Sequence, residues 1–133
     1  MVIIEYSSNI TPPVEMIIDL YVDAGLKRPV QDNDRIRSMY ENANLIVTAW
    51  DAKLLVGVSR ALTDFSYCCY LSDLAVRSSY QKQGIGRKLI ELTKSHCGEQ
   101  SMLLLLSAPA ALSYYPGVGF RQVENGFVID RKI

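Results

Sequence analysis

Residues 70–97 constrain the fold of this chain most, because two glycines, two positions apart, stand between a predicted strand and a predicted helix. The strand, Leu71–Val76, is mostly apolar, and the helix that follows carries apolar residues at spacings of three and four. Its predicted buried face comprises Ile85, Leu89, Ile90, Leu92 and Thr93. Gly84 and Gly86 leave the backbone N–H groups of the first helical turn approachable, at the positive end of the helix dipole. The stretch therefore predicts an anion site for a phosphorylated ligand.

The spacing of the glycines distinguishes between phosphate-binding motifs. A dinucleotide fingerprint, G-x-G-x-x-G, would need a third glycine where Leu89 stands, and no P-loop string G-x-x-x-x-G-K-[ST] occurs. The pattern Q/R-x-x-G-x-G/A is filled by Gln81, Gly84 and Gly86. The alternative is that the glycines only begin a packed helix in an unrelated α/β protein. That alternative does not explain why the chain has two glycines here, since each glycine loses more backbone entropy on folding than another residue would.

Two further stretches accompany the glycine pattern. The strand before it reads LSDLAV, and Tyr114–Phe120 reads YYPGVGF, an aromatic–Tyr pair followed after a short gap by Gly-Phe. From Leu54 to Phe120 the chain resembles the GNAT superfamily of acyl-CoA-dependent N-acyltransferases, whose pyrophosphate signature has the glycine pattern above. The resemblance implies an α+β fold, layered α/β/α, with a mixed central sheet that contains a splayed parallel strand pair.

Hydrophobic periodicity and turn residues predict the other elements. The first half of the chain predicts a strand at Val2–Tyr6, a helix that begins at Thr11-Pro12-Pro13 and ends at Gly25, a helix from about Asp32–Asp34 to Asn42–Asn44, and a hairpin of Leu45–Trp50 with Lys53–Leu62. The second half predicts a buried parallel strand at Met102–Leu106, a short helix at Ala108–Tyr115, and closing strands at Phe120–Val123 and Phe127–Ile129. Gly57, inside a predicted strand, indicates a bulge or a close approach.

The composition fits one soluble globular domain over residues 1–133. The chain is 49% apolar and 21% charged, and its 14 Lys and Arg balance 14 Asp and Glu, so charge favours neither nucleic acid nor a membrane surface as partner. No apolar run approaches the ~20 residues of a spanning helix, and the N-terminus has no basic signal-peptide region. The three cysteines form no even framework and no metal-ligand spacing, so we expect no metal and a reducing, cytoplasmic location.

The resemblance implies that acetyl-CoA, a form of coenzyme A, is the cofactor. It would lie where the strands Leu71–Val76 and Met102–Ser107 splay apart, with its pantetheine arm paired to strand backbone and its pyrophosphate on the glycine turn. The cofactor-binding residues implied in this way are Leu74, Ala75, Val76, Gln81, Lys82, Gln83, Gly84, Ile85, Gly86, Arg87 and Lys88. A backbone N–H near Leu74 would face the thioester oxygen. The side-chain charges could equally be solvated cations at a helix start.

The resemblance also implies that Tyr115 is the general acid, because a phenol with a pKa of ~10 can donate a proton to a departing thiolate. Tyr114 matches the family's inward-packing aromatic. Relatives often carry a base at the positions of Tyr70 or Ser72, and neither residue here is a useful base. Asp73 is the remaining candidate; strand parity places it on the opposite face unless a bulge re-aims it, and it could be structural instead. A water chain could also carry the proton.

The acceptor pocket is the least defined part of the site. The resemblance places it between the first two helices, their joining loop and the hairpin, so Arg28, Arg60, Asp64 and Tyr70 are candidates, and either arginine could attract a carboxylate. Each arginine could equally be an ordinary ion-pair residue. We expect an N-acetyltransferase that acts on a primary amine of a small molecule or a peptide, or alternatively a non-catalytic acyl-CoA-binding or protein-interaction module on the same fold. The apolar closing strands also suggest a homodimer.

Overall fold

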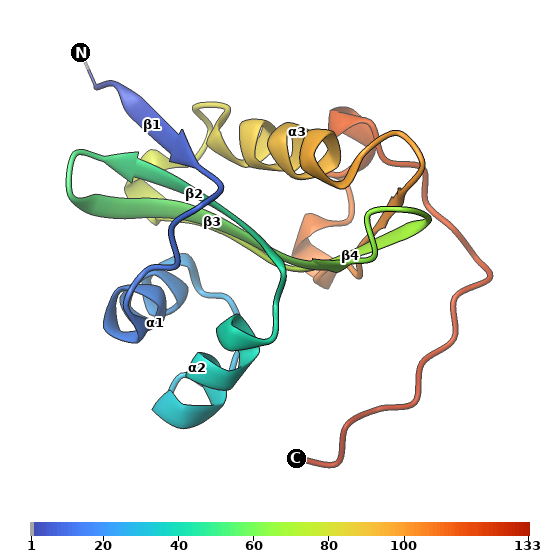
Figure 1. Ribbon diagram of the computed structural model, residues 1–133, viewed down its shortest axis with the longest axis horizontal. Helices are drawn as coiled ribbons and strands as arrows, with labels where there is room; N and C mark the ends of the chain where they lie inside the picture. The colour runs from blue at the N-terminus through green and yellow to red at the C-terminus, as the bar shows by residue number, and fades with distance from the viewer. Residues whose placement is uncertain (1) are drawn as a thin grey trace.

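A long antiparallel hairpin lies at the centre of the computed structural model, which describes residues 2–133 (Figure 1). The helices and strands, in chain order, are β1 (Ile4–Ser7), α1 (Val14–Ala24), α2 (Asn33–Glu41), β2 (Leu45–Asp51), β3 (Leu54–Thr63), β4 (Cys68–Val76), α3 (Ile85–Cys97) and β5 (Met102–Leu104). Three short 3-10 turns complete the set: η1 (Ser78–Tyr80), η2 (Pro109–Ala111) and η3 (Pro116–Val118). The hairpin β2–β3 confirms the prediction of two antiparallel strands joined by a short turn.

The five strands form one mixed sheet in which spatial order follows chain order, β1-β2-β3-β4-β5. Neighbours from β1 to β4 are antiparallel, and β4 and β5 are parallel across the connecting helix α3. This arrangement confirms the α+β class and the predicted strand–helix–strand unit. The parallel pairing covers only three residues of each strand, from Cys68 opposite Met102 to Tyr70 opposite Leu104.

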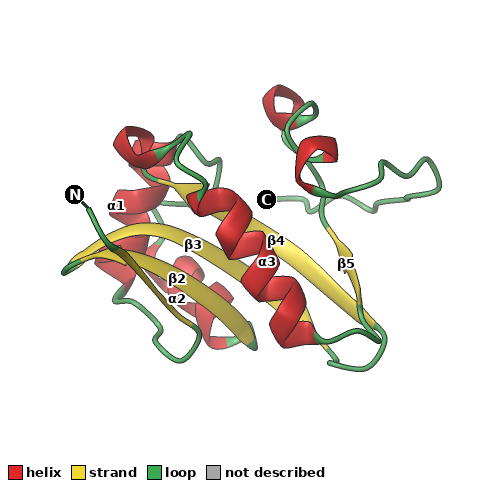
Figure 2. Cartoon of the chain, turned by 90° about the horizontal axis from the view of Figure 1, so that it is seen from above, coloured by secondary structure: helices red, strands yellow, loops and turns green. Residues whose placement is uncertain are grey.

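Helices cover both faces of the sheet, which gives the expected three layers (Figure 2). α3 lies on one face, where Ile85, Leu89 and Ile90 pack on apolar residues of β2, β3 and β4. α1 and α2 cover the other face with a second cluster around Ile17 and Tyr21. Among residues 2–133, no helix combines the length and the apolar character that crossing a bilayer requires.

Gly57 marks a close approach between β3 and α3, and a register shift lies beside it. A Cβ at this position would lie 3.0 Å from Leu89 Cδ1, 3.2 Å from Ile85 Cγ2 and 3.4 Å from Ala49 Cβ. The helix can therefore rest on the sheet only because residue 57 has no side chain.

Gly57→Ala is expected to lower the free energy of unfolding by about 1–3 kcal/mol, because the added methyl overpacks the contact between α3 and the sheet. Urea denaturation followed by circular dichroism measures this loss. The matched control is Gly117→Ala, whose Cβ would meet nothing within 4 Å. Equal stability of the two variants would contradict the close approach.

The sequence prediction is wrong for most elements after β5, and it makes β5 itself too long. The segment Ala108–Tyr115 forms turns and η2 rather than a regular helix, and Pro116 lacks the N–H that would continue a helical ladder. The predicted strand Met102–Leu106 ends at Leu104, and it lies at the sheet edge with Met102 half exposed instead of buried.

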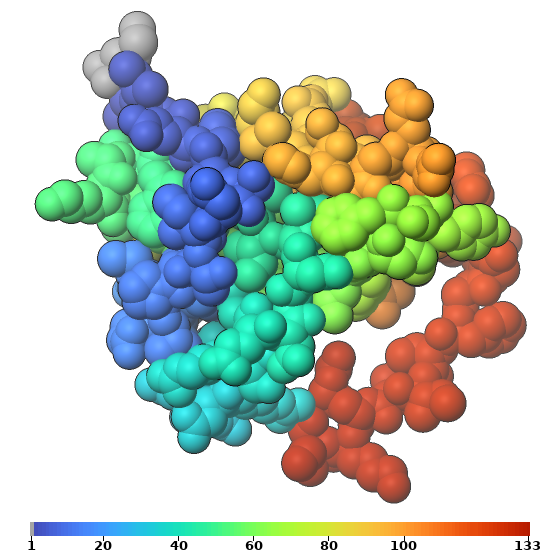
Figure 3. Space-filling model, viewed as in Figure 1, coloured from blue at the N-terminus to red at the C-terminus, as the bar shows by residue number. Residues whose placement is uncertain are grey.

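The closing strands predicted at Phe120–Val123 and Phe127–Ile129 do not form, because no strand edge lies beside them to accept their hydrogen bonds. Residues 121–133 instead run as an extended arm, which stands off the rest of the molecule over most of its length (Figure 3). Phe127 and Ile129 on this arm are each 99% exposed. The arm ends near α2, where Arg35 Nη2 donates to the Ile133 carbonyl at 3.0 Å.

Candidate functional site

The turn between η1 and α3 exposes a row of backbone donors. Gly84 adopts the left-handed conformation, with φ 86° and ψ 4°, immediately before α3 begins, and Lys82 also has a positive φ of 64°. Within the described part of the chain, the backbone N–H groups of residues 82–87 donate to no protein acceptor. The first turn of a helix leaves such donors free, and the dipole of the 13-residue α3 adds positive potential there. The turn is therefore built to receive an anion, as the glycine pattern predicts.

Hydrogen bonds from three residues fix the segment that leads into this turn. Arg77 donates to the Leu55 carbonyl at 3.0 Å and pairs with Asp19 of α1 at 2.9 Å. Ser78 N–H donates to Asp23 at 2.7 Å. The Tyr80 hydroxyl donates to Asp51 at the end of β2. Because these contacts reach α1, β2 and β3, the turn begins from a rigid base.

The side chains around the turn are open to solvent. Gln81, Lys82, Gln83, Arg87 and Lys88 are all exposed. Gln81 Nε2 donates to the Val76 carbonyl at 3.0 Å, and Arg87 forms a helix-surface pair with Glu91 at 3.6 Å. Such an exposed ion pair contributes little, so Arg87 can exchange it for a phosphate at low cost.

β4 and β5 splay apart next to this turn. β5 pairs with β4 only as far as Tyr70, so Leu71–Val76 of β4 has no neighbouring strand on that side (Figure 2). The three residues expected to pair with an acyl-carrying chain, Leu74, Ala75 and Val76, lie in this unpaired stretch. An extended ligand could add to it as an extra strand.

A bulge in β4 decides which way its residues face. Ala61 of β3 pairs with Leu71 and Arg60 pairs with Asp73, so Ser72 is the extra residue. The bulge reverses the alternation of the strand, so that Asp73 and Ala75 face α1 and α2 whereas Leu74 packs toward α3. The bulge that the sequence analysis named as the condition for turning Asp73 to the other face of the strand is thus present.

Asp73 is completely buried and its carboxylate is fully engaged. Oδ1 accepts from Arg28 Nε at 2.7 Å, and Oδ2 accepts from Arg60 Nε at 2.8 Å and the Tyr21 hydroxyl at 2.6 Å. Burial raises the pKa of this carboxyl, but hydrogen bonds and charge from Arg60 outweigh burial and hold the pKa below its usual value. A buried, ionised carboxylate with these partners is a poor proton acceptor, so the geometry favours the structural alternative for Asp73 over a catalytic base.

The acceptor candidates separate into different environments. Arg60 is only 8% exposed and donates to Asp73, to Ser72 Oγ and to the Met39 carbonyl, so it is a core residue. Arg28 is 27% exposed and Tyr70 38% exposed, so both remain accessible from solvent. Asp64 caps the β3–β4 turn by accepting from three backbone N–H groups, which lowers the pKa of its carboxyl to about 2.

Of the two adjacent tyrosines, Tyr115 packs inward and Tyr114 does not. Tyr115 packs toward the α3-side core, edge-on to Phe120 with ring centroids 5.5 Å apart, whereas Tyr114 is 41% exposed. The expectation that Tyr114 packs inward is wrong, because Pro116 follows the pair and no regular helix sets its direction. The Tyr114 hydroxyl lies beside Gly86, 2.9 Å from where a Cβ would be. Burial, and next the neighbouring Tyr114, raise the pKa of Tyr115, so its phenol keeps its proton at neutral pH.

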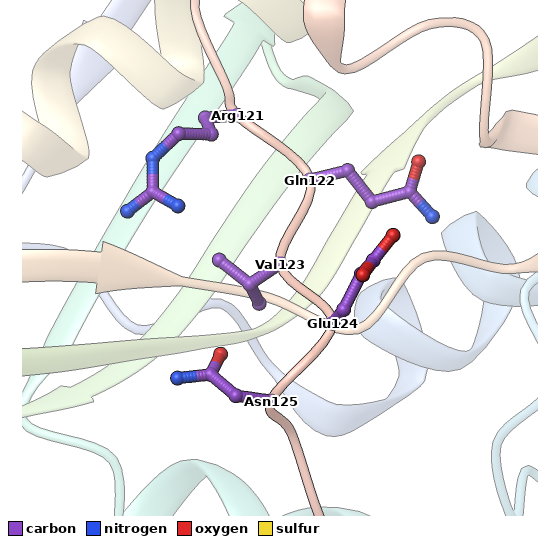
Figure 4. Close-up of a pocket in the computed structure, with 5 residues that line it drawn as sticks. All are labelled: Arg121, Gln122, Val123, Glu124 and Asn125. Carbon is purple, nitrogen blue, oxygen red and sulfur yellow. The ribbon is translucent and has the colours of Figure 1, made fainter.

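Figure 4 shows the side chains of Arg121, Gln122, Val123, Glu124 and Asn125, which line an open pocket along the arm. These are five consecutive residues of one segment, and none of the predicted site residues belongs to them. The pocket is a concave stretch of the arm rather than a place where elements converge, so the turn and the splay remain the candidate site.

Comparison with known proteins decides the family. A family model described as "Acetyltransferase (GNAT) domain" matches residues 19–130. The chain belongs to the GNAT acetyltransferases. Acetyl-CoA is the acetyl donor of this family.

Individual GNAT relatives agree with this assignment. A 63-residue stretch is 35% identical to N-alpha-acetyltransferase 30 from Saccharomyces cerevisiae and covers 44% of this chain and 36% of that protein. A probable acetyltransferase from methicillin-resistant Staphylococcus aureus has a similar structure, with a TM-score of 0.82 at 24% identity over 97% of this chain and all of the other. The aminoglycoside N-acetyltransferase AAC(6')-Iy in complex with CoA superposes with a TM-score of 0.75 at 12% identity, over 100% and 97% of the two chains. At these identities the two structures show the fold alone.

Sequence reasoning named Asp73, Arg28 and Arg60 separately, but it missed Tyr21 and the contacts that join all four residues. Tyr21 and Arg28 lie 52 and 45 positions from Asp73 along the chain. An isolated carboxylate in an apolar strand signals that a partner exists, but only the fold identifies the partner.

Proposed function

We propose that the chain is an acetyl-CoA-dependent N-acetyltransferase that transfers the acetyl group to a primary amine of a small molecule or a peptide by direct attack on the thioester. The observation that carries the proposal is the juxtaposition of the strand Leu71–Val76, whose edge on the β5 side is unpaired, with the free backbone N–H groups of the turn 82–87. Together they offer a strand edge and an anion cradle in one continuous segment.

Cofactor binding follows from these two stretches. The N–H groups from Gln81 to Arg87 would hold the pyrophosphate, with added charge from Lys82, Arg87 and Lys88. The backbone of Leu74, Ala75 and Val76 would pair with the pantetheine arm as an added strand. These residues fit the donor, because the N–H groups of residues 82–87 have no protein acceptor within the described chain and Gln81 N–H makes only a 3.4 Å contact with the Ser78 carbonyl.

The chain's own groups would then carry the proton and charge changes of acetyl transfer. When bound, acetyl-CoA supplies the activated acetyl group. A backbone N–H just after the Ser72 bulge would stabilise negative charge on the thioester oxygen. Tyr115 would donate its proton to the departing thiolate, and its raised pKa keeps that proton available at neutral pH. Because Asp73 is saturated by cations, we propose that water rather than a side chain accepts the proton of the amine.

Arg28 supports an acceptor that carries a carboxylate or carbonyl near its amine. Nε, Nη1 and Nη2 of Arg28 each make one hydrogen bond within the described chain, whereas a guanidinium has five N–H donors. The free donors of this 27% exposed side chain and the neighbouring Tyr70 would then line the acceptor pocket. An acceptor series that compares free carboxylates with their amides tests this role, since KM should rise when the carboxylate is blocked.

Acetyl-CoA is expected to raise the melting temperature of the protein in a concentration-dependent way. At a concentration 100 times its Kd, the ligand should add about 2.7 kcal/mol to the free energy of unfolding. Thermal melts with acetyl-CoA, CoA and ATP, followed by an amine panel with detection of the released thiol, measure binding and turnover. A protein indifferent to millimolar acetyl-CoA would contradict the proposal, and binding without turnover on any amine would favour the non-catalytic acyl-CoA-binding module.

The arm supports a homodimer. Phe127 and Ile129 are fully exposed on it, and the outer edge of β5 is unpaired. In a dimer, the exposed apolar arm of one copy could pair with the open edge of β5 in the other copy.

Light scattering is expected to give twice the chain mass for the wild type, and Phe127→Asp with Ile129→Asp should give the monomer mass. Val22→Asp, at a 62% exposed apolar residue of α1, is the matched control and should leave the mass unchanged. A wild type that is monomeric at every concentration rules the dimer out.

We further propose a reducing, cytoplasmic location. The thiols of Cys68, Cys69 and Cys97 are all free, and Cys69 and Cys97 are buried. Titration of three free thiols in denatured protein, purified without reductant from its native source, tests this location.

A further inference from the structure

Two arginines from different elements meet on one buried carboxylate inside the sheet. Arg28 follows α1 and Arg60 belongs to β3, and their Nε atoms lie 2.7 and 2.8 Å from the two oxygens of Asp73. The Tyr21 hydroxyl, which also contacts Tyr40 at 2.5 Å, donates to the same carboxylate. The cluster therefore ties α1, α2, β3 and β4 to a single point.

Both arginines reach past Asp73 to the bulged residue. Arg28 Nη2 donates to the Ser72 carbonyl at 2.6 Å, and Arg60 Nη2 donates to Ser72 Oγ at 2.9 Å. Ser72 is the residue that the β3–β4 register skips. Its backbone and its side chain are thus each held by one guanidinium, and Asp73 holds both guanidinium groups.

The position of this bulge matters for the site. It follows Tyr70, where pairing with β5 ends, and it precedes Leu74–Val76. Because strand side chains and backbone groups alternate with a period of two, loss of the extra residue would turn every later N–H of β4 to the opposite edge. Burying charges together costs desolvation energy and is an inefficient way to gain stability alone, which favours a role in fixing geometry.

We propose that Asp73, Arg28 and Arg60 are positioning residues that lock the Ser72 bulge and thereby aim the backbone N–H near Leu74 at the thioester carbonyl. This inference rests on the proposed acetyltransferase function. None of the three residues touches the reacting atoms in this role; they act through the backbone of Ser72.

The experiment measures the carbonyl stretch of acetyl-CoA, labelled with carbon-13 at the carbonyl, by isotope-edited infrared spectroscopy on the full chain without acceptor. A hydrogen bond to the thioester oxygen lowers this frequency, so the wild-type complex should absorb below free acetyl-CoA. Arg28→Lys keeps the charge next to Asp73 but lacks the fork that also reaches Ser72. Most of the frequency shift should disappear in this variant, and kcat should fall on the order of 10²-fold, the usual effect of losing one oxyanion donor. The Kd for CoA, which has no acyl carbonyl, should stay close to the wild-type value.

Asp73→Asn is the second variant, and Asp64→Asn is the matched control. Asp64 also organises backbone at the start of β4 through three N–H groups, but it makes no contact with Ser72. Its loss should leave the infrared shift, which is measured without acceptor, intact. If Asp73→Asn does not fold, Arg28→Lys decides, because Arg28 lies at the surface of the cluster.

The outcomes separate this inference from the proposed function. A wild type that does not bind acetyl-CoA overturns the proposed function, before any variant is made, and this inference with it. A wild type that binds acetyl-CoA and shows the shift, with the same shift and kcat in Arg28→Lys, overturns the positioning role alone. A shift lost in both cluster variants and kept in Asp64→Asn supports it.

Discussion

Tyr115→Phe is expected to lower kcat by about 10²-fold or more while leaving acetyl-CoA affinity unchanged, because the ring stays and only the donated proton is lost. The loss should appear equally in kcat and kcat/KM, since the proton is transferred only in the transition state. Steady-state kinetics with thiol detection, together with a thermal-shift titration of acetyl-CoA, separates chemistry from binding. The ring contacts of Tyr115 with Tyr114 and Phe120, at centroid distances of 5.2 and 5.5 Å, should keep the variant folded.

Tyr114→Phe is the matched comparison, one residue away and with the same atom removed. Its hydroxyl lies against Gly86 at the turn, so this variant should change cofactor affinity modestly and leave kcat intact. If the loss of kcat follows Tyr114 instead, the acid is the outward-facing tyrosine and the assignment to Tyr115 is wrong. Similar behaviour of both variants would mean that the pair serves packing alone.

Gly86→Val is expected to abolish the stabilisation by acetyl-CoA, a loss of about 2.7 kcal/mol at a ligand concentration of 100 times the wild-type Kd. A side chain at residue 86 would project toward Val76 Cγ2, 3.7 Å from the added Cβ, and would displace the Tyr114 hydroxyl. Val76 Cγ2 and the Tyr114 hydroxyl both lie where the turn meets β4. The free protein should stay folded, because the displaced atom is the end of a partly exposed side chain. Calorimetric titration with acetyl-CoA measures the change.

Gly84 requires a different control, because its left-handed backbone strains any other residue whatever the ligand. Gly84→Ala is therefore compared with Gly25→Ala, since Gly25 ends α1 with φ 72° and also has open space around its Cβ. Both variants should lose similar stability, and only Gly84→Ala should weaken acetyl-CoA binding. Equal cofactor affinity in the two variants, or wild-type affinity in Gly86→Val, would contradict an anion site at this turn.

Local patterns were sufficient to predict the centre of the molecule. The hairpin β2–β3, the strand β4 and the helix α3 each carry their own signal, as alternation or as a spacing of three and four, and the glycines mark the turn. These elements hold the predicted cofactor residues next to one another in the chain. The continuous part of the candidate site therefore follows from local patterns, and its cofactor role stays a prediction.

The rest depends on contacts that no local pattern encodes. Apolar residues at Phe127–Ile129 predict a strand, but a strand also needs an edge to pair with, and none lies beside this segment. The partners of Asp73 come from two other elements, so its burial between arginines follows only from the fold. The directions of Tyr114 and Tyr115 depend on the irregular backbone around Pro116, which periodicity cannot describe.

The short pairing of β5 also has a dynamic consequence. Only three residue pairs join β5 to the sheet, whereas seven join β3 to each of its neighbours, β2 and β4. Local opening free energies follow such differences, so β5 should detach without unfolding of the hairpin or of α3. Native-state hydrogen exchange would then occur first at β5 amides, and each such opening would widen the gap beside Leu71–Val76. A ligand that pairs with Leu71–Val76 as an extra strand would fill this gap. It would therefore slow hydrogen exchange at the β5 amides without contacting them.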